Sequence, residues 1–320
     1  MASAMSEHLV SLVVPFLNEE ACIPAFLDAI EAYAASVSFP LEVLFVDDGS
    51  TDRSCEVLAA HTPRNTEMKL IRLSRNFGMH AAIRAGLSLA AGDRATFIGI
   101  DLQEPLSMIG EMYEKIQSGY DIVGAQKEEV QETGLRRLFS SLYADLMRKY
   151  ASPNMPKGGC NSLMITRKVL DEFNRYCERN SSVMIQIINM GFQTTFIPCK
   201  YHERSGGGSK WTLSKKIKLF IDSFVSFSYF PIRCVSVIGI LLFLLGVLYT
   251  LYLLISKLIH PAFYIQGWAT LISVILIGFG LTNLSLGIIA EYLWRTLDAS
   301  RNQPAYIIQS TCPLPRPTEK

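Results

Sequence analysis

Two long apolar segments near the C-terminus limit what this chain can fold into more than any other feature. Residues 232–255 contain a single charge, Arg233 at their edge, and residues 268–290 contain none. Each segment exceeds the roughly 20 residues that a helix needs to cross a 30 Å hydrocarbon core. A pair of buried core helices is the alternative, but such helices rarely stay free of charge over this length. The sequence therefore predicts two transmembrane helices within residues 232–290.

The charges around these segments predict how the chain is oriented. Arg295 and Arg301 follow the second segment, whereas the connecting residues 256–267 contain one lysine. Positive residues favour the cytoplasmic side of a membrane. We therefore expect both termini to be cytoplasmic and residues 256–267 to be external. The basic residues ahead of the spans are Lys210, Lys215, Lys216, Lys218 and Arg233.

The residues just before the first apolar segment, 211–230, combine lysines at one end with apolar side chains at near-helical spacing. This pattern predicts an amphipathic helix that lies in the membrane interface. A helix packed on the soluble part of the chain is the alternative, and it stays open. The apolar positions are Trp211, Leu213, Ile217, Phe220, Ile221 and Phe224.

Composition excludes several classes of protein. The chain is 49% hydrophobic and 18% charged, which is too apolar for a wholly soluble protein and too charged for one that lies in the membrane throughout. A net charge of +1 gives no preference for nucleic acid. The seven cysteines form no C-x-x-C pair, so we expect reduced thiols that face the cytosol rather than a disulfide framework or a zinc site. The N-terminus has no secretory signal pattern.

Ahead of residue 206, short apolar runs alternate with helical patterns. Such alternation predicts an α/β domain, doubly wound around a mostly parallel sheet, with ligands at the carboxyl ends of the strands. No G-x-G-x-x-G or P-loop motif is present, so a dinucleotide fold is disfavoured. The expected strands are residues 10–16, 41–47, 68–73, 95–101, 122–125, 162–165 and 194–198. The expected helices are residues 20–33, 53–60, 79–90, 107–117, 134–150, 168–175 and 183–190.

Six motifs in a fixed order carry a family resemblance. They read VVPFLNEE (13–20), VLFVDDGSTD (43–52), SRNFGMHAAIRAG (74–86), GD (92–93), GIDLQEP (99–105) and RSGGGSKW (204–211). Together they resemble the inverting family 2 glycosyltransferases with the GT-A fold. The polyprenyl-phosphate glycosyltransferases, which include dolichol-phosphate mannose synthase and bactoprenol glucosyltransferases, are the most similar subgroup. The resemblance implies a cytoplasmic GT-A domain in residues 1–205, a phosphate-binding loop and interfacial helix in 206–231, two spans in 232–290 and a cytoplasmic tail in 291–320.

The resemblance also implies a site for a nucleotide sugar. Pro15, Leu17 and Glu19 would line the base and ribose, and Val46 and Asp48 would close that pocket, where carboxylates can accept hydrogen bonds from hydroxyl and N–H groups. Taken alone, the DDGS sequence is equally typical of a turn that leads into a capped helix.

Asp101 and Gln103 are implied as ligands of Mg²⁺ or Mn²⁺, which neutralises the leaving diphosphate. Asp101 is thus the first candidate catalytic residue, although a plain carboxylate at a strand end is the alternative. Arg204 and Lys210, with Ser209 beside the lysine, are expected to bind phosphate oxygens as further catalytic residues. A basic linker that attracts anionic lipid is the alternative for that loop.

Three positions depart from the family pattern. Gly99 replaces the first aspartate of the D-x-D motif, Gln126 stands where many relatives have arginine, and Asn161 stands where relatives often have aspartate. A site with fewer carboxylates should bind the metal more weakly and rely on diphosphate oxygens. His80 is expected to be structural or to line the donor pocket.

The resemblance implies an inverting, metal-dependent hexosyltransferase at a bacterial inner membrane, one that contributes to the cell envelope, as in O-antigen modification. It would move glucose from UDP-glucose onto an undecaprenyl-type phosphate; an aminoarabinose or N-acetylhexosamine donor stays open. Processive glycan synthesis is disfavoured because no Q-x-x-R-W motif occurs. A degenerate homologue that binds lipid or partner proteins without catalysis is the rival of a different class. A homo-oligomer also stays open, since small residues in the second segment suit helix contacts.

Overall fold

A computed structural model gives the fold. It describes residues 8–127, 154, 156, 159–176, 182–200, 267–300 and 304–315, with single positions between 235 and 259. The chain divides into two units: unit 1 comprises Met1–Ser223 and Pro304–Lys320, and unit 2 comprises Phe224–Gln303. The end of the chain therefore belongs to the same unit as its beginning.

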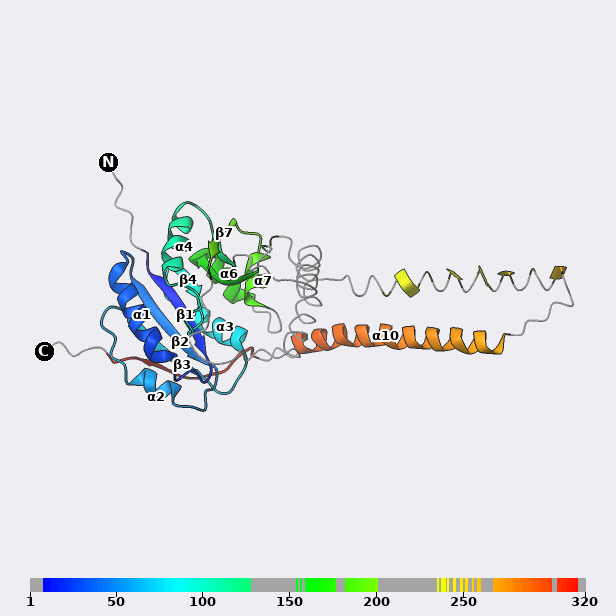
Figure 1. Ribbon diagram of the computed structural model, residues 1–320, viewed down its shortest axis with the longest axis horizontal. Helices are drawn as coiled ribbons and strands as arrows, with labels where there is room; N and C mark the ends of the chain where they lie inside the picture. Colours follow the sequence, from blue (N-terminus) through cyan, green and yellow to red (C-terminus); the bar gives the residue numbers. More distant parts are fainter. Residues whose placement is uncertain are drawn as a thin grey trace. The chain divides into compact units, whose positions relative to one another are not determined.

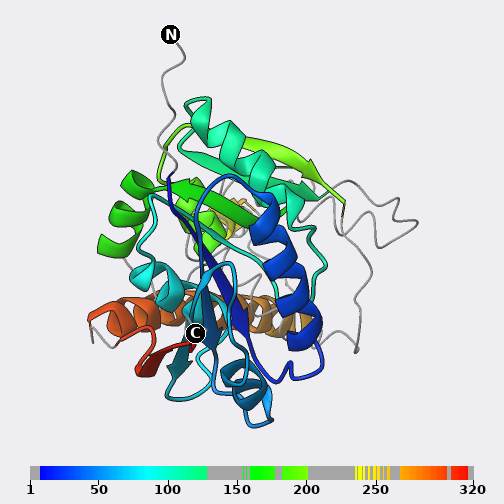
Figure 2. The same ribbon diagram turned by 90° about the vertical axis from the view of Figure 1, so that its left-hand side faces the viewer.

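The described part of unit 1 is built on an eight-stranded sheet in the order β7-β5-β6-β4-β1-β2-β3-β8 (Figures 1 and 2). β1 pairs in parallel with both β2 and β4, β2 with β3, and β5 with β7, whereas β6 and β8 run antiparallel to their neighbours. The predicted mostly parallel α/β sheet is confirmed. The strands are β1 Val10–Phe16, β2 Leu41–Asp47, β3 Glu67–Leu73, β4 Arg94–Phe97, β5 Ile122–Lys127, β6 Cys160–Thr166, β7 Thr194–Cys199 and β8 Ile308–Pro313.

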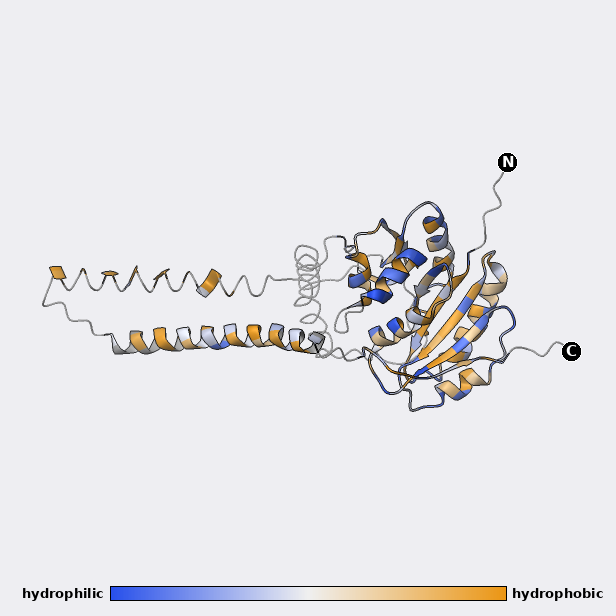
Figure 3. Cartoon of the chain, turned by 180° about the vertical axis from the view of Figure 1, so that it is seen from behind, coloured by the Kyte–Doolittle hydropathy of each residue, from blue (hydrophilic) through white to orange (hydrophobic). Residues whose placement is uncertain are grey.

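The central strands are buried on both faces. All seven residues of β1 and all seven of β2 are buried, and Figure 3 shows these strands as largely hydrophobic. Continuous apolar runs of this kind are typical of a parallel sheet that is covered on both sides.

Helices cover the two faces and create two apolar clusters. One cluster joins α1, α2 and α4 to the sheet, and the other joins α3, α6 and α7 to the opposite face. A proline in the first turn of α1 supplies the backbone angle that a helix start requires. The helices are α1 Ile23–Ser36, α2 Ser54–Ala59, α3 Met79–Leu89, α4 Ser107–Gln117, α6 Arg167–Arg175 and α7 Val183–Ile188.

Two features of the sheet differ from the expectation. β4 ends at Phe97 rather than at residue 101, because the chain turns at Ile100 and Asp101. β8, at the end of the chain, was not expected from the sequence at all; it adds an antiparallel edge to β3 (Figure 1). The reason is long-range pairing, which a local pattern does not reveal.

Unit 2 contains helix α10, Trp268–Ser300, which begins where the second apolar segment begins. In the described parts of the chain, no helix combines the length and the hydropathy needed to cross a membrane. The interfacial helix expected in residues 211–230 and the helix expected in residues 134–150 lie outside the described residues, as does much of the first apolar segment.

Candidate active site

The carboxyl ends of three adjacent strands bring the predicted site residues to one edge of the sheet. β1 lies between β2 and β4, and all three run in the same direction. The loops after them, which begin at Leu17, Asp48 and Ile98, therefore leave the sheet on the same side. This is the topological switch point, where α/β sheets bind ligands.

The loop after β1 is tied to the turn after β2. Asn18 has a left-handed backbone (φ 53°), its N–H donates to Ser50 Oγ (2.9 Å), and its Oδ1 accepts the Thr51 N–H (2.8 Å). The Glu19 N–H donates to Ser54 Oγ (2.9 Å). Asn tolerates the left-handed region better than most residues, and this is the signal by which the sequence could have identified Asn18. The two loops therefore form one bonded unit.

Asp47 and Asp48 hold the backbone of the site. Asp47 is fully buried; it accepts the Ser50 N–H (2.7 Å) and pairs with Arg72 Nε (3.3 Å). Asp48 accepts the N–H groups of Phe77 (2.7 Å) and Gly78 (2.9 Å) on its two oxygens. Burial raises the pKa of the Asp48 carboxyl above its ordinary value, while the two amides act in the opposite direction. Since a carboxylate oxygen has more than one lone pair, a bond from a nucleoside to Asp48 remains feasible.

The segment after β4 has an unusual backbone at Leu102, whose φ is 52°. Non-glycine residues in this region cluster at functional sites, where surrounding contacts hold them. Leu102 lies between Asp101 and Gln103, and both of these are partly exposed. Next along the chain, Glu104 is buried and accepts a short hydrogen bond from Ser162 Oγ on β6. The sequence alone does not reveal this hydrogen bond, because it joins positions far apart in the chain.

Gly99 lies directly against Asp101. A Cβ atom built at residue 99 would be 2.9 Å from Asp101 Oδ1. The Asp101 carboxylate therefore occupies the space that a side chain at residue 99 would need. The replacement of the first D-x-D aspartate by glycine and the position of Asp101 are consistent with each other.

The other predicted residues fall into three groups. Leu17 and Glu19 are partly exposed on the loop after β1, at the same edge as Asp101. Pro15 and Val46 are paired in the β1–β2 register and buried, and Val46 packs in the cluster under α3. Arg204, Ser209 and Lys210 lie outside the described residues, so their roles stay predictions.

Gln126 and Asn161 reach the same edge from a different part of the sheet. β5 runs parallel to β1 and β4, because each of β4 and β5 is antiparallel to β6. The end of β5 at Gln126 and the start of β6 at Asn161 therefore lie on the side where the loops of β1, β2 and β4 emerge. An amide at each of these positions supplies hydrogen-bonding groups without charge.

His80 and Arg84 form a polar cluster on α3. Arg84 is 2% exposed, donates to Gln186 Oε1 (2.7 Å) and lies over the Phe173 ring at 5.0 Å. Burial lowers the pKa of His80 to about 4, and the charge of Arg84 contributes in the same direction. His80 is therefore neutral at pH 7.

Two side chains at this edge are suited to bind a divalent cation. Asp101 supplies a carboxylate and Gln103 an amide oxygen, and both are ligand types that Mg²⁺ and Mn²⁺ accept. Among the described residues, no cluster of three or more His, Cys, Asp or Glu side chains is suited to a metal. Mg²⁺ typically binds through one or two carboxylates, waters and substrate phosphates. The donor set therefore fits a cation that is shared with a diphosphate.

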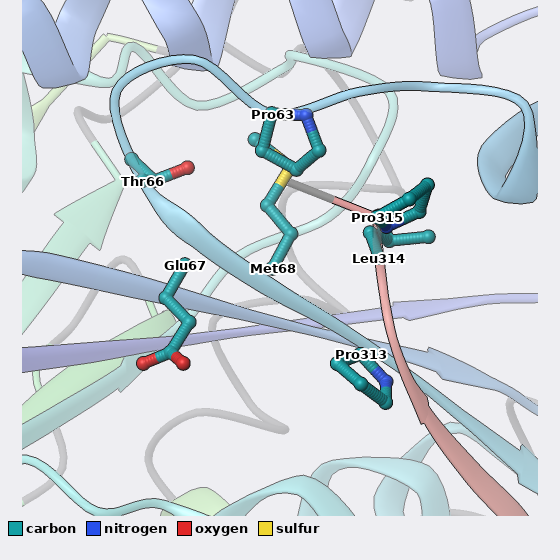
Figure 4. Close-up of a pocket in the computed structure, with 7 residues that line it drawn as sticks. All are labelled: Pro63, Thr66, Glu67, Met68, Pro313, Leu314 and Pro315. Atoms are coloured by element: carbon teal, nitrogen blue, oxygen red, sulfur yellow. The ribbon is translucent and has the colours of Figure 1, made fainter. Parts of the chain in front are cut away.

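A pocket of about 340 Å³ lies elsewhere, at the start of β3 and the end of β8 (Figure 4). The start of a parallel strand is at the opposite edge from its carboxyl end, so this pocket is separate from the residues above. Its lining residues are Pro63, Thr66, Glu67, Met68, Pro313, Leu314 and Pro315.

Comparison with known proteins identifies the family. The model for "Glycosyl transferase family 2" matches residues 11–173, which include the loops after β1, β2 and β4. The chain belongs to this family. As a family 2 glycosyltransferase it is an enzyme that transfers a sugar, which confirms the resemblance inferred from the motifs.

Relatives match nearly the whole length of this glycosyltransferase. An uncharacterized glycosyltransferase, YkcC, of Bacillus subtilis is 35% identical over 309 residues, covering 96% of this chain and 95% of the relative. An undecaprenyl-phosphate 4-deoxy-4-formamido-L-arabinose transferase of Edwardsiella ictaluri is 31% identical, covering 100% of this chain and 99% of the relative. Among solved structures, a mannosyltransferase of Pyrobaculum calidifontis in complex with GDP-Man and Mn²⁺ has a TM-score of 0.44 at 16% identity, covering 92% of this chain and 88% of the other.

Proposed function

We propose that this enzyme transfers a sugar from a nucleoside diphosphate to polyprenyl phosphate, with inversion, at the cytoplasmic face of a membrane. The observation that carries the proposal is that relatives matching nearly the whole chain are named undecaprenyl-phosphate 4-deoxy-4-formamido-L-arabinose transferases. The meeting of the loops after β1, β2 and β4 at one edge supports it. Within the proposal, the GT-A domain binds the donor at that edge.

Residues of this chain would hold the donor in two ways. Leu17, Glu19 and the bonded unit around Asn18 would contact the nucleoside. Asp101 and Gln103 would hold a divalent cation, which neutralises charge on the departing diphosphate when it is bound. Ser209, Arg204 and Lys210 would bind the phosphate oxygens of donor or acceptor.

The acceptor explains why this site needs no strong general base. A phosphate monoester is largely doubly ionised at pH 7, since its second pKa is about 6. Its oxygen can bond to the anomeric carbon while the bond from that carbon to the diphosphate oxygen breaks. Asp47 and Asp48 accept hydrogen bonds from backbone N–H groups. These bonds suit carboxylates that hold the loops in place better than carboxylates that take a proton from the acceptor.

The donor sugar has three candidates, since an N-acetylhexosamine stays open beside the two that follow. The names of the relatives favour a 4-deoxy-4-formamido-arabinose type of sugar, and the motifs led us to expect glucose from UDP-glucose. A 4-deoxy-4-formamido-arabinose is a five-carbon sugar with nitrogen on carbon 4, whereas glucose is a six-carbon sugar with a hydroxyl group there, so a panel of donors separates them.

The membrane assignment rests on the two long apolar segments and on exposed apolar side chains in unit 2. Along α10, large apolar residues such as Val274, Ile277 and Phe279 are more than half exposed. Exposed apolar surface of this extent indicates contact with lipid or with another protein. We therefore propose that residues 232–255 and 268–290 anchor the enzyme in the membrane.

The experiment uses the full chain, purified in detergent, with undecaprenyl phosphate, Mn²⁺ or Mg²⁺ and radiolabelled nucleotide sugars. We expect one donor to give a labelled lipid that thin-layer chromatography resolves. If no donor gives a labelled lipid, the enzyme is not a polyprenyl-phosphate transferase, and a non-catalytic binding role is favoured.

Asp101→Asn is the first variant to test. We expect it to reduce turnover at least 100-fold, because the amide has lost the charge that binds the cation, while the melting temperature stays within about 2 °C, as for most exposed sites. Asp28→Asn, at an exposed position on α1, is the matched control and should retain full turnover. Normal turnover in Asp101→Asn would remove this residue from the site.

A further inference from the structure

The C-terminal segment of the chain is bonded to the loop that follows β3. β8 pairs antiparallel with β3 from Lys69↔Pro313 to Leu73↔Ile308. Just before β8, the carbonyl oxygen of Ile307 accepts the Ser74 N–H at 2.9 Å. Residues that follow α10 in the chain thus fix the first residue of the loop Ser74–Gly78.

The other end of this loop is fixed by the turn after β2. Phe77 and Gly78 donate their N–H groups to Asp48, at 2.7 and 2.9 Å. Gly49 lies so near that a Cβ atom there would be 2.7 Å from the carbonyl carbon of Arg75. The loop is therefore held between the C-terminal segment and the turn that we assign to the donor.

A β-bulge determines where the C-terminal segment meets the loop. Arg72 pairs with Ser310 and Leu73 with Ile308, so Gln309 is an extra residue on β8. Bulges bend a strand and re-aim the residues beside it, and they are frequent next to active sites. If Gln309 instead paired regularly with Leu73, the Ile307 carbonyl would lie one position further along β3, opposite Arg75, so the bulge aligns this carbonyl with Ser74. Tyr306 and Phe77 also pack against the same apolar cluster.

We propose that the C-terminal segment is a positioning element of the donor site, and that Ile307 is its positioning residue. The Ile307 carbonyl and the bulge at Gln309 hold the loop Ser74–Gly78 against Asp48, and Asp48 keeps the turn of the donor pocket in place. The inference rests on the proposed function, because it assigns that turn to nucleotide binding.

Ser74→Pro in the full-length protein tests the inference, because proline has no N–H to donate to the Ile307 carbonyl. Ser74→Ala, which keeps that N–H, is the matched control. Three properties are measured in detergent: hydrogen exchange of the peptide covering residues 72–80, the Kd for UDP and for GDP with Mn²⁺, and the KM and kcat for the donor. We expect Ser74→Pro to speed exchange in residues 72–80 but not in β1 or α1. We also expect a Kd and a donor KM about fivefold higher, the order for one lost backbone hydrogen bond, with kcat within twofold. Ser74→Ala should match the wild type.

The outcomes separate the inference from the proposed function. If the wild type binds neither nucleotide, the proposed function fails, whatever the variants do. If the wild type binds but Ser74→Pro leaves both Kd and KM unchanged, the positioning role is wrong. If Ser74→Pro does not fold, Tyr306→Ala decides, because it removes a side chain from the apolar cluster that Phe77 also joins and keeps β8. Faster exchange in residues 72–80 with a raised Kd would support the role, and no change in either would overturn it.

Discussion

Gly99 and Asp101 show how one missing carboxylate changes the cation site. Asp101 is the only carboxylate of the expected D-x-D pair, and its Oδ1 lies where a side chain at residue 99 would begin. An aspartate at residue 99 requires Asp101 to rotate, which the end of a side chain does at small cost. The native chain would therefore rely on the diphosphate to complete the coordination of the cation.

Gly99→Asp should raise the affinity for Mn²⁺ in the absence of nucleotide by roughly tenfold, because affinity follows the number of charged ligands. Free Mn²⁺ measured by electron paramagnetic resonance gives this affinity without reference to turnover. Gly99→Ala displaces Asp101 but adds no ligand, so it should not tighten binding. An equal gain in both variants would contradict the explanation.

His80 gives a prediction on pH. Its pKa of about 4 in the folded protein is below its ordinary value of 6.5, so the unfolded chain binds more protons between these values. The free energy of unfolding should therefore fall as the pH drops from about 6.5 to about 4. His80→Asn keeps an acceptor near the Val183 N–H and does not titrate, so its stability should fall less over this range. Chemical denaturation in detergent at several pH values measures the difference; parallel curves would exclude His80 as the cause.

At the scale of elements, the contact of α3 with β1 depends on Gly86. A Cβ atom at residue 86 would be 2.3 Å from Val13 Cγ1 and 3.1 Å from Val46 Cγ2. Such overlap forces the helix away from the sheet that carries the donor turn.

Gly86→Ala should therefore lower the free energy of unfolding by about 1–2 kcal/mol, since overpacking costs more than the gain in helix propensity returns. Ser88→Ala, at an exposed position on the same helix, is the control and should change little. Combining Gly86→Ala with Val13→Ala should recover part of the loss, because the overlapping methyl groups are removed. Purely additive effects would show that the two residues do not meet.

The sequence predicted the elements that local pattern determines. The apolar runs of β1 and β2 gave the observed bounds, as did the amphipathic pattern of α4. β8 was missed because its residues, which include Pro313, become a strand only by pairing with β3. Likewise, Asp48 was expected to face a nucleoside, and its bonds to Phe77 and Gly78 depend on a loop about 30 positions away. Contacts between distant segments are what the pattern of one sequence does not contain.

At the scale of the whole molecule, the chain leaves unit 1, forms unit 2 and returns to unit 1. If residues 232–255 and 268–290 both cross the membrane, the return is on the side from which the chain left. The excess of basic residues on both flanks agrees with this arrangement.

Reporter fusions test the arrangement. Alkaline phosphatase inserted after His260 should be active, because it would be external, whereas fusion after Lys320 should be inactive. A green fluorescent protein series at the same positions should give the reverse pattern and serves as the control. Equal phosphatase activity at both positions would contradict two membrane crossings.

The return of the chain also affects how the protein is made. β3 is synthesised well before its partner β8, with which it pairs as far as Leu73 and Ile308. At elongation rates of 5–20 residues per second, the ribosome takes roughly 10–50 s to travel between them. During that interval the nascent sheet has a bare edge, and bare edges recruit strands from other chains. Lys69 and Arg72 place two cations on β3, and charged side chains of this kind discourage pairing of an edge with other chains.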